Sequence, residues 1–144
     1  EDFDIRFSNL MQYLDTHNDW DVFQGVIADV GNVEIQNVEE CNEETIVYLN
    51  HMVSTVFNYY QSHMFDRVIS WDETDANQLT NTIDRALESK DLKVVTTVPF
   101  LVGHKEDLKS TIWGFENTEY TDWILRSSEK LQKLVNDFKG EKHD

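Results

Sequence analysis

Apolar positions in the first fifteen residues repeat at helical spacing. Five of them are separated by steps of one, three or four: Phe3, Phe7, Leu10, Met11 and Leu14. On a helix with 3.6 residues per turn these side chains share one face. Asp2 or Asp4 can cap the first turn, because an aspartate side chain accepts hydrogen bonds from the free N–H groups there. The pattern predicts a helix over residues 3–15.

The next apolar stretch fits two structures. As a helix its stripe would be Trp20, Phe23, Ile27 and Val30; as a β-hairpin one face would carry Val26, Ala28, Val30, Val33 and Ile35. Two β-branched runs that flank the pair Gly31-Asn32 favour the hairpin, because such pairs are typical of tight turns. We expect a hairpin over residues 26–38.

The longest apolar pattern extends over residues 43–68. Its main stripe again alternates steps of three and four: Ile46, Leu49, Val53, Val56 and Tyr60. Further apolar residues widen this face, as is typical of a central helix: Tyr48, Met52, Phe57 and Tyr59. Ser70 and Glu73 then have the spacing of a capping box, which predicts another helix over residues 70–89.

The last third of the chain predicts one strand and two helices. Residues 92–102 are rich in β-branched side chains, and Pro99 lacks an amide donor, which indicates an edge strand or a strand end; we expect the edge strand. A short helix over 105–113 and a last helix over 120–139 follow. The expected fold class is α+β and mostly α: a helical bundle of about five helices with a small antiparallel β element, made of the hairpin near 26–38 and the edge strand near 92–102.

Length and composition predict one globular domain, residues 1–144. The chain is 40% apolar and 12% aromatic, which exceeds what a disordered acidic tail contains. Cys41 is the only cysteine, so no internal disulfide can form, and a cytoplasmic location is the simpler expectation. Residue 1 is Glu rather than Met, so a periplasmic or secreted location stays open. No apolar run is long enough to suggest a membrane span.

Charge is distributed unevenly along the chain. The first 89 residues contain no lysine, three arginines and 18 acidic residues, whereas the remaining 55 contain nine basic and ten acidic residues. Almost the whole net charge of −16 therefore belongs to the first part. Packing does not require such a one-signed field, which costs self-repulsion. It argues against binding nucleic acid or an anionic membrane directly, and it favours a cationic partner.

Motifs for catalysis or cofactor binding are absent from the sequence. There is no nucleophile elbow, no P-loop, no dinucleotide-binding glycine pattern and no metal-binding histidine pair. The carboxylates Glu40, Glu43, Asp72 and Asp75 have a spacing that resembles the magnesium signature of all-α nucleoside triphosphate pyrophosphatases. Two antiparallel helices would hold these pairs at opposite ends, so we expect no enzyme, no catalytic residue, no metal ligand and no cofactor.

Acidic residues gather at three places, two of them beside a tryptophan. These residues are the expected partner-binding site: Asp19, Trp20, Asp21, Glu39, Glu40, Glu43, Glu44, Trp71, Asp72, Glu73 and Asp75. Interfaces commonly combine an aromatic anchor with charges that accelerate encounter.

The sequence therefore predicts an acidic inhibitory protein of the immunity-protein or antitoxin type, which neutralises a basic enzyme by occlusion. The most natural partner is a cognate nuclease toxin, because nuclease clefts are positively charged to hold phosphate. Two alternatives remain: a DNA mimic that acts on DNA-binding proteins, and the carboxylate-metal pyrophosphatase.

Overall fold

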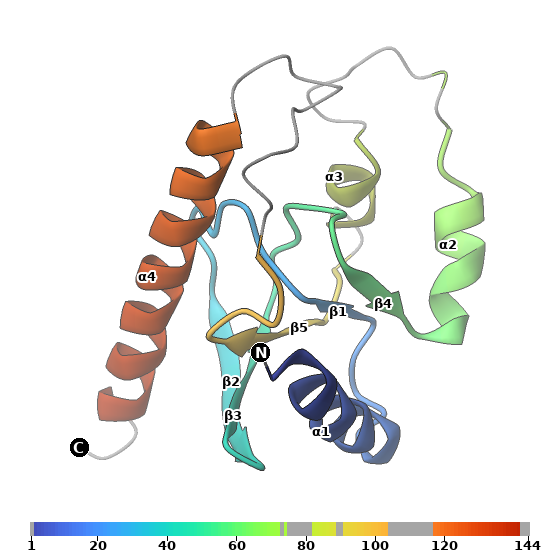
Figure 1. Cartoon of the computed structure of the whole chain (residues 1–144). Helices are drawn as coiled ribbons and strands as arrows, with labels where there is room; N and C mark the ends of the chain where they lie inside the picture. Colours follow the sequence, from blue (N-terminus) through green and yellow to red (C-terminus); the bar gives the residue numbers. More distant parts are fainter. Residues whose placement is uncertain (1, 73, 75–81, 89–90, 104–116, 142–144) are drawn as a thin grey trace.

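The computed structural model describes residues 2–72, 74, 82–88, 91–103 and 117–141 (Figure 1). Within them lie four α-helices, one 3-10 helix and five strands. The helices are α1 (Phe3–Thr16), η1 (Ser62–Met64), α2 (Phe65–Ile69), α3 (Ile83–Glu88) and α4 (Asn117–Glu141). The strands are β1 (Val22–Gln24), β2 (Ile35–Cys41), β3 (Glu44–Leu49), β4 (Asn58–Tyr60) and β5 (Val94–Val98).

The five strands form one mixed sheet in the order β2-β3-β5-β1-β4. Only β1 and β5 pair in parallel; β2 with β3, β3 with β5 and β1 with β4 are antiparallel. Strand β5 is central, and all five of its residues are buried. Strands that are covered on both faces commonly have a continuous run of β-branched residues, and β5 has the sequence VVTTV.

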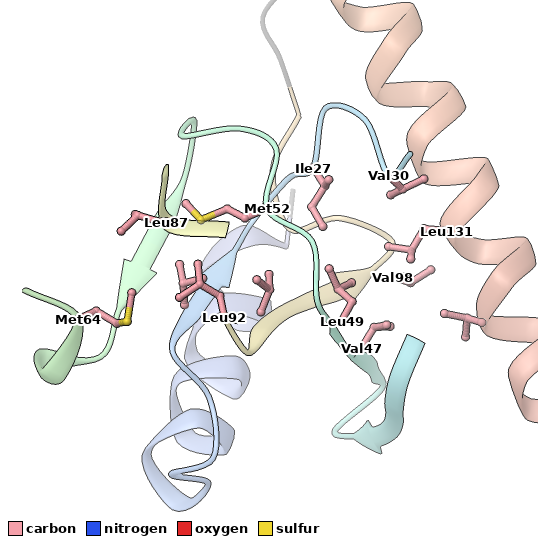
Figure 2. Packing of buried hydrophobic residues seen from close by; sticks show 13 residues of the cluster. Ile27, Val30, Val47, Leu49, Met52, Met64, Leu87, Leu92, Val98 and Leu131 are labelled. Carbon is pink, nitrogen blue, oxygen red and sulfur yellow. The ribbon is translucent and has the colours of Figure 1, made fainter. Parts of the chain in front are cut away.

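Helices cover both faces of this sheet. Neighbouring residues of one strand point to opposite faces, so Val94 of β5 packs on one side and Val95 on the other. The face of Val95 is covered by α1 through Leu10 and Leu14. The opposite face carries the larger cluster, in which α4 supplies Leu131, while Met64 and Leu87 come from η1 and α3 (Figure 2).

The helices predicted at the two ends of the chain are confirmed. Helix α1 begins at Phe3 and ends at Thr16, and α4 contains all of the predicted 120–139. The predicted helix over 105–113 lies outside the described residues.

The predicted central helix over 43–68 is wrong. This segment contains β3, β4, η1 and α2, and Asn42 and Glu43 turn the chain from β2 into β3 with φ angles of 48° and 70°. The misleading spacing arises because β3 is buried on both faces: Ile46 faces the α1 side, and Val47 and Leu49 face the α4 side. The expected bundle of about five helices is therefore replaced by a mixed α+β fold.

The predicted hairpin over 26–38 is also wrong, although its turn exists. Gly31 has a φ of 45°, and the Val33 N–H donates to the carbonyl of Val30 at 3.0 Å. Residues 26–30, the predicted first arm, form no strand, and β2 pairs instead with β3. The hairpin of this fold is thus Ile35–Leu49.

Two further predictions need correction. The strand predicted at 92–102 exists as β5, but it is central rather than an edge, because Pro99 lies just beyond its last residue and removes no ladder hydrogen bond. Ser70 does not start a helix; it follows the end of α2, and its backbone N–H donates to the carbonyl of Asp66. Within the predicted 70–89, the structure describes a helix only over Ile83–Glu88.

Candidate functional site

Helix α1 and the hairpin of β2 and β3 bring together acidic residues that are distant in sequence. Asp19, just beyond α1, and Glu39 of β2 line one hollow, which we call the α1 hollow. Glu43 and Glu44 line a second, the hairpin hollow, with Asp2 and Arg6 from the start of the chain. Asp19 of one predicted acidic group and Glu39, Glu43 and Glu44 of another therefore lie on the α1 side of the sheet.

The α1 hollow has a volume of about 520 Å³. Most of its lining residues are polar or charged, and they are Thr16, His17, Asn18, Asp19, Gln36, Asn37, Glu39, Tyr48 and Lys93.

A hydrogen-bonded network fixes Glu39 in this hollow. The Tyr13 hydroxyl donates to Glu39 Oε2 at 2.7 Å, and the Asn37 side-chain amide donates to Glu39 Oε1 at 2.8 Å. The hydroxyls of Tyr13 and Tyr48 are 2.6 Å apart. Both carboxylate oxygens of Glu39 thus have a protein partner, while 37% of its side-chain surface stays exposed.

The tyrosine hydroxyls of this network are held in their neutral form. Burial, followed by the hydrogen bonds to Tyr48 and Glu39, raises the pKa of Tyr13 far above its usual value. Burial also raises the pKa of Tyr48, and the negative charges of Glu39 and Asp19 act in the same direction. Each shift has the same cause, because a phenolate would be poorly hydrated and close to a carboxylate.

His17 extends this network from the end of α1. Its ring stacks on Tyr13 with centroids 3.9 Å apart, and its Nδ1 is 2.7 Å from the Tyr13 carbonyl. Its Nε2 is 3.9 Å from Glu39 Oε2. The imidazole is therefore positioned by backbone and ring contacts, with one nitrogen toward the carboxylate.

Asp19 and Asp21 both contact Lys93, which precedes β5. The Lys93 ammonium forms an ion pair with Asp19, and this hydrogen bond raises the pKa of Lys93. Asp21 accepts the Lys93 backbone N–H at 2.9 Å and lies 2.6 Å from Nε2 of His63. Asp21 thus connects three segments of the fold, whereas 87% of the Asp19 side-chain surface is exposed.

Trp20 lies in the core instead of on the surface that its neighbours suggested. Its exposed fraction is 3%, and it packs in the α1 cluster, where its indole N–H donates to the Leu14 carbonyl at 3.3 Å. The expectation of an accessible aromatic anchor therefore does not hold for Trp20.

In the hairpin hollow, Glu44 forms the most buried ion pair of the described residues. Two nitrogens of Arg6 donate to its carboxylate oxygens at 2.6 and 2.7 Å, and only 8% of the Glu44 side-chain surface is exposed. This bidentate bond raises the pKa of Arg6. Arg6 also donates to the carbonyls of Pro99 and Phe100. Glu44 thus attaches α1 to the sheet, while Glu43 beside it is exposed.

Glu40 connects the hairpin to the opposite helix. It pairs with Lys139 of α4 and accepts a hydrogen bond from Thr45. The contact with Lys139 lowers the pKa of Glu40. Because 59% of the Glu40 side-chain surface is exposed, this ion pair stays accessible to solvent.

The third predicted group lies away from these hollows. Trp71 is half-buried after α2, and Asp72 is exposed and accepts hydrogen bonds from the backbone and hydroxyl of Thr74. These bonds lower the pKa of Asp72. Glu73 and Asp75 lie outside the described residues.

Sequence reasoning did not single out His17, Tyr48 and Lys93 of the α1 hollow, or Tyr13, which donates to Glu39 beside it. The spacing of Tyr13 and His17 on a helix end was a usable signal, because residues four apart share a face. Tyr48 could not be placed beside Tyr13 while residues 43–68 were expected to form a helix.

The geometry removes the basis for the pyrophosphatase interpretation. That site needs two helices that each supply a carboxylate pair, but Glu40 is on β2 and Glu43 in the turn that follows. Within the part of the chain that the structure describes, no three His, Cys, Asp or Glu side chains are grouped so that they could hold a metal ion. In the same part, no helix combines the length and apolar character needed to cross a membrane. No protein family, curated protein or solved structure matches this chain.

Proposed function

We propose that this chain is an acidic binding protein that inhibits a basic enzyme, of the immunity-protein or antitoxin type, with a nuclease toxin as its cognate partner. It acts by occlusion and not by catalysis. The proposed interface is the α1 side of the sheet, where Glu39 and Glu43 of the hairpin line the two hollows together with Asp19 and Asp2, which flank α1. The proposed location is the cytoplasm, where a nuclease toxin would otherwise reach its substrate.

One observation supports this proposal above the others. Arg6 is the only basic residue in α1 and in the hairpin Ile35–Leu49, and its guanidinium is bound to Glu44. The outward charges of these segments are therefore all negative, including Asp4, Asp15 and Glu43. A surface with one sign of charge accelerates association with a surface of the opposite sign and selects against anionic partners.

The test is inhibition of a nuclease together with the salt dependence of binding. The first candidate nuclease is the protein encoded next to the gene for this chain, since immunity and antitoxin genes lie next to the genes of their toxins. Association rates at about 50 mM and about 300 mM salt should differ at least tenfold if encounter is electrostatic. The nuclease should lose its activity when an equimolar amount of this chain is added.

Two results would contradict the proposal. Equal binding to many unrelated cationic proteins, independent of salt, would show that acidity serves no specific partner. Competition with duplex DNA for a wide range of DNA-binding proteins would identify a DNA mimic instead.

A further inference from the structure

The lining of the α1 hollow indicates which chemical group it receives. Small-molecule sites of this size are lined mainly by apolar and aromatic side chains with few polar groups. The α1 hollow has more polar groups than such a site, because eight of its nine lining residues are polar or charged and the ninth is Tyr48. Such a lining suits a group that forms several hydrogen bonds and carries charge.

Glu39 is prepared to accept a planar cation. A carboxylate offers about four acceptor positions, two on each oxygen. Tyr13 fills one on Oε2 and Asn37 one on Oε1, so each oxygen keeps acceptor capacity. A guanidinium donates two parallel hydrogen bonds to the two oxygens of a carboxylate, whereas an ammonium is a point charge.

The cation already in the hollow does not fill this role. The Lys93 ammonium is paired with Asp19 and not with Glu39. Because Asp19 already compensates the charge of Lys93, this ammonium attracts the α-carboxylate of a free amino acid only weakly. The hollow is therefore better matched to an arginine side chain presented by a protein than to free arginine.

We propose that the α1 hollow receives an arginine side chain of the partner protein, whose guanidinium donates to Glu39 beside the Tyr48 ring. This rests on the proposed function for the source of the arginine. Stacking of a guanidinium near a tyrosine ring adds a further attraction. Glu39 sets the specificity, and Lys93 opposes the bound cation.

The test uses N-acetyl-arginine amide as the probe, with amide and side-chain NMR signals of the full chain as the readout. The largest shifts should fall on Gln36, Asn37 and His17. Glu39→Gln should raise the Kd at least about fivefold, as expected for loss of a charge-assisted hydrogen bond. Asp66→Asn is the matched control, because Asp66 is an exposed acid on α2 and its loss changes the net charge equally.

A second variant has the opposite expected sign. Lys93→Gln removes the competing ammonium and frees Asp19, so it should lower the Kd about twofold to fivefold. A gain of binding cannot result from a misfolded hollow, so this variant separates the site from a loss of structure. If Glu39→Gln and Asp66→Asn weaken binding equally, only the general field acts and the proposal is overturned.

Other probes separate the possible sources of the guanidinium. N-acetyl-lysine amide should bind more weakly, and N-acetyl-citrulline amide, which has no charge, should not bind. Free arginine that binds several times more tightly than the amide would overturn the proposal in favour of a small-molecule site.

The two proposals can fail separately. Inhibition of a nuclease that is unaffected by Glu39→Gln would retain the proposed function and remove the arginine site. If the arginine probe binds at Glu39 but no nuclease is inhibited, the arginine site would be retained and the proposed function removed.

Discussion

Helices α1 and α4 cover opposite faces of the same sheet, but the signs of their exposed charges differ. Helix α4 has 25 residues and carries both signs on its exposed surface, including Asp122, Arg126, Glu129 and Lys133. Helix α1 carries Asp4 and Asp15, and its only cation, Arg6, is bound to Glu44. Both helices pack by burying an apolar stripe, so the difference in charge is not a requirement of packing.

The two helices also reach the hairpin by contacts of different strength. Helix α1 contacts it through the Arg6–Glu44 pair and the Tyr13–Glu39 bond, both close to the core. Helix α4 packs on it through the buried Leu131, but its polar contact is the solvent-accessible pair of Lys139 and Glu40. This comparison indicates that the α1 side has the more ordered polar surface, which favours it as the interface.

The largest expected effect on stability comes from losing the ion pair between Arg6 of α1 and Glu44. Glu44→Gln should lower the free energy of unfolding by about 3 kcal/mol, because removing one partner of a buried pair leaves the other charge uncompensated. Urea denaturation measures this loss. An unchanged midpoint would mean that Arg6 is stabilised by the carbonyls of Pro99 and Phe100 alone.

Alkaline pH should weaken the α1 side next. The pKa values of Tyr13 and Tyr48 are raised in the folded state, so above about pH 10 the unfolded chain binds fewer protons than the native chain. Their contribution is therefore complete below that pH and is lost as pH rises, at no more than about 1.4 kcal/mol per unit for each tyrosine. Unfolding measured between about pH 9 and about pH 11 tests this.

Tyr48→Phe is the matched variant for this pH dependence. It removes one titrating group and the hydroxyl contact with Tyr13, and it should cost about 1 kcal/mol at neutral pH. The loss of stability at alkaline pH should also be smaller than in the unmodified chain. A steeper alkaline loss in the variant would contradict the assignment to these tyrosines.

The smallest expected effect is on the α4 contact. Glu40→Gln should lower the free energy of unfolding by less than about 1 kcal/mol, because exposed ion pairs are screened by solvent and salt. A double-mutant cycle with Lys139→Gln isolates the pair. A coupling energy comparable to that of Arg6 and Glu44 would remove the difference between the two sides.

Parts of the fold could be predicted because local pattern alone determines them. Helices α1 and α4 have one exposed face, so their apolar residues recur with the helical period. Residues 43–68 have the same helical spacing without forming one long helix, because β3 is covered on both faces and its apolar residues do not alternate simply with polar ones. A continuous apolar run fits a buried strand and a central helix equally well.

The acidic residues of the candidate site could be predicted from the sequence, but which of them lie together could not. Asp19 and Glu39 could be named from the sequence, yet their meeting in one hollow depends on where α1 ends relative to β2. Trp20 shows the opposite error, since acidic neighbours suggested exposure while its indole fills the core. The sequence shows which residues carry a charge, whereas the tertiary fold determines which side chains are exposed to solvent.

The most direct test of the account compares equal charge changes on the two sides. One variant replaces Asp15, Glu39 and Glu43 on the α1 side by their amides; the other replaces Glu119, Asp122 and Glu129 of α4 by theirs. At low salt, the first should slow association with the inhibited nuclease about tenfold or more, and the second less than about twofold. Equal slowing by both variants would contradict the account, because binding would then depend on net charge and not on the α1 side.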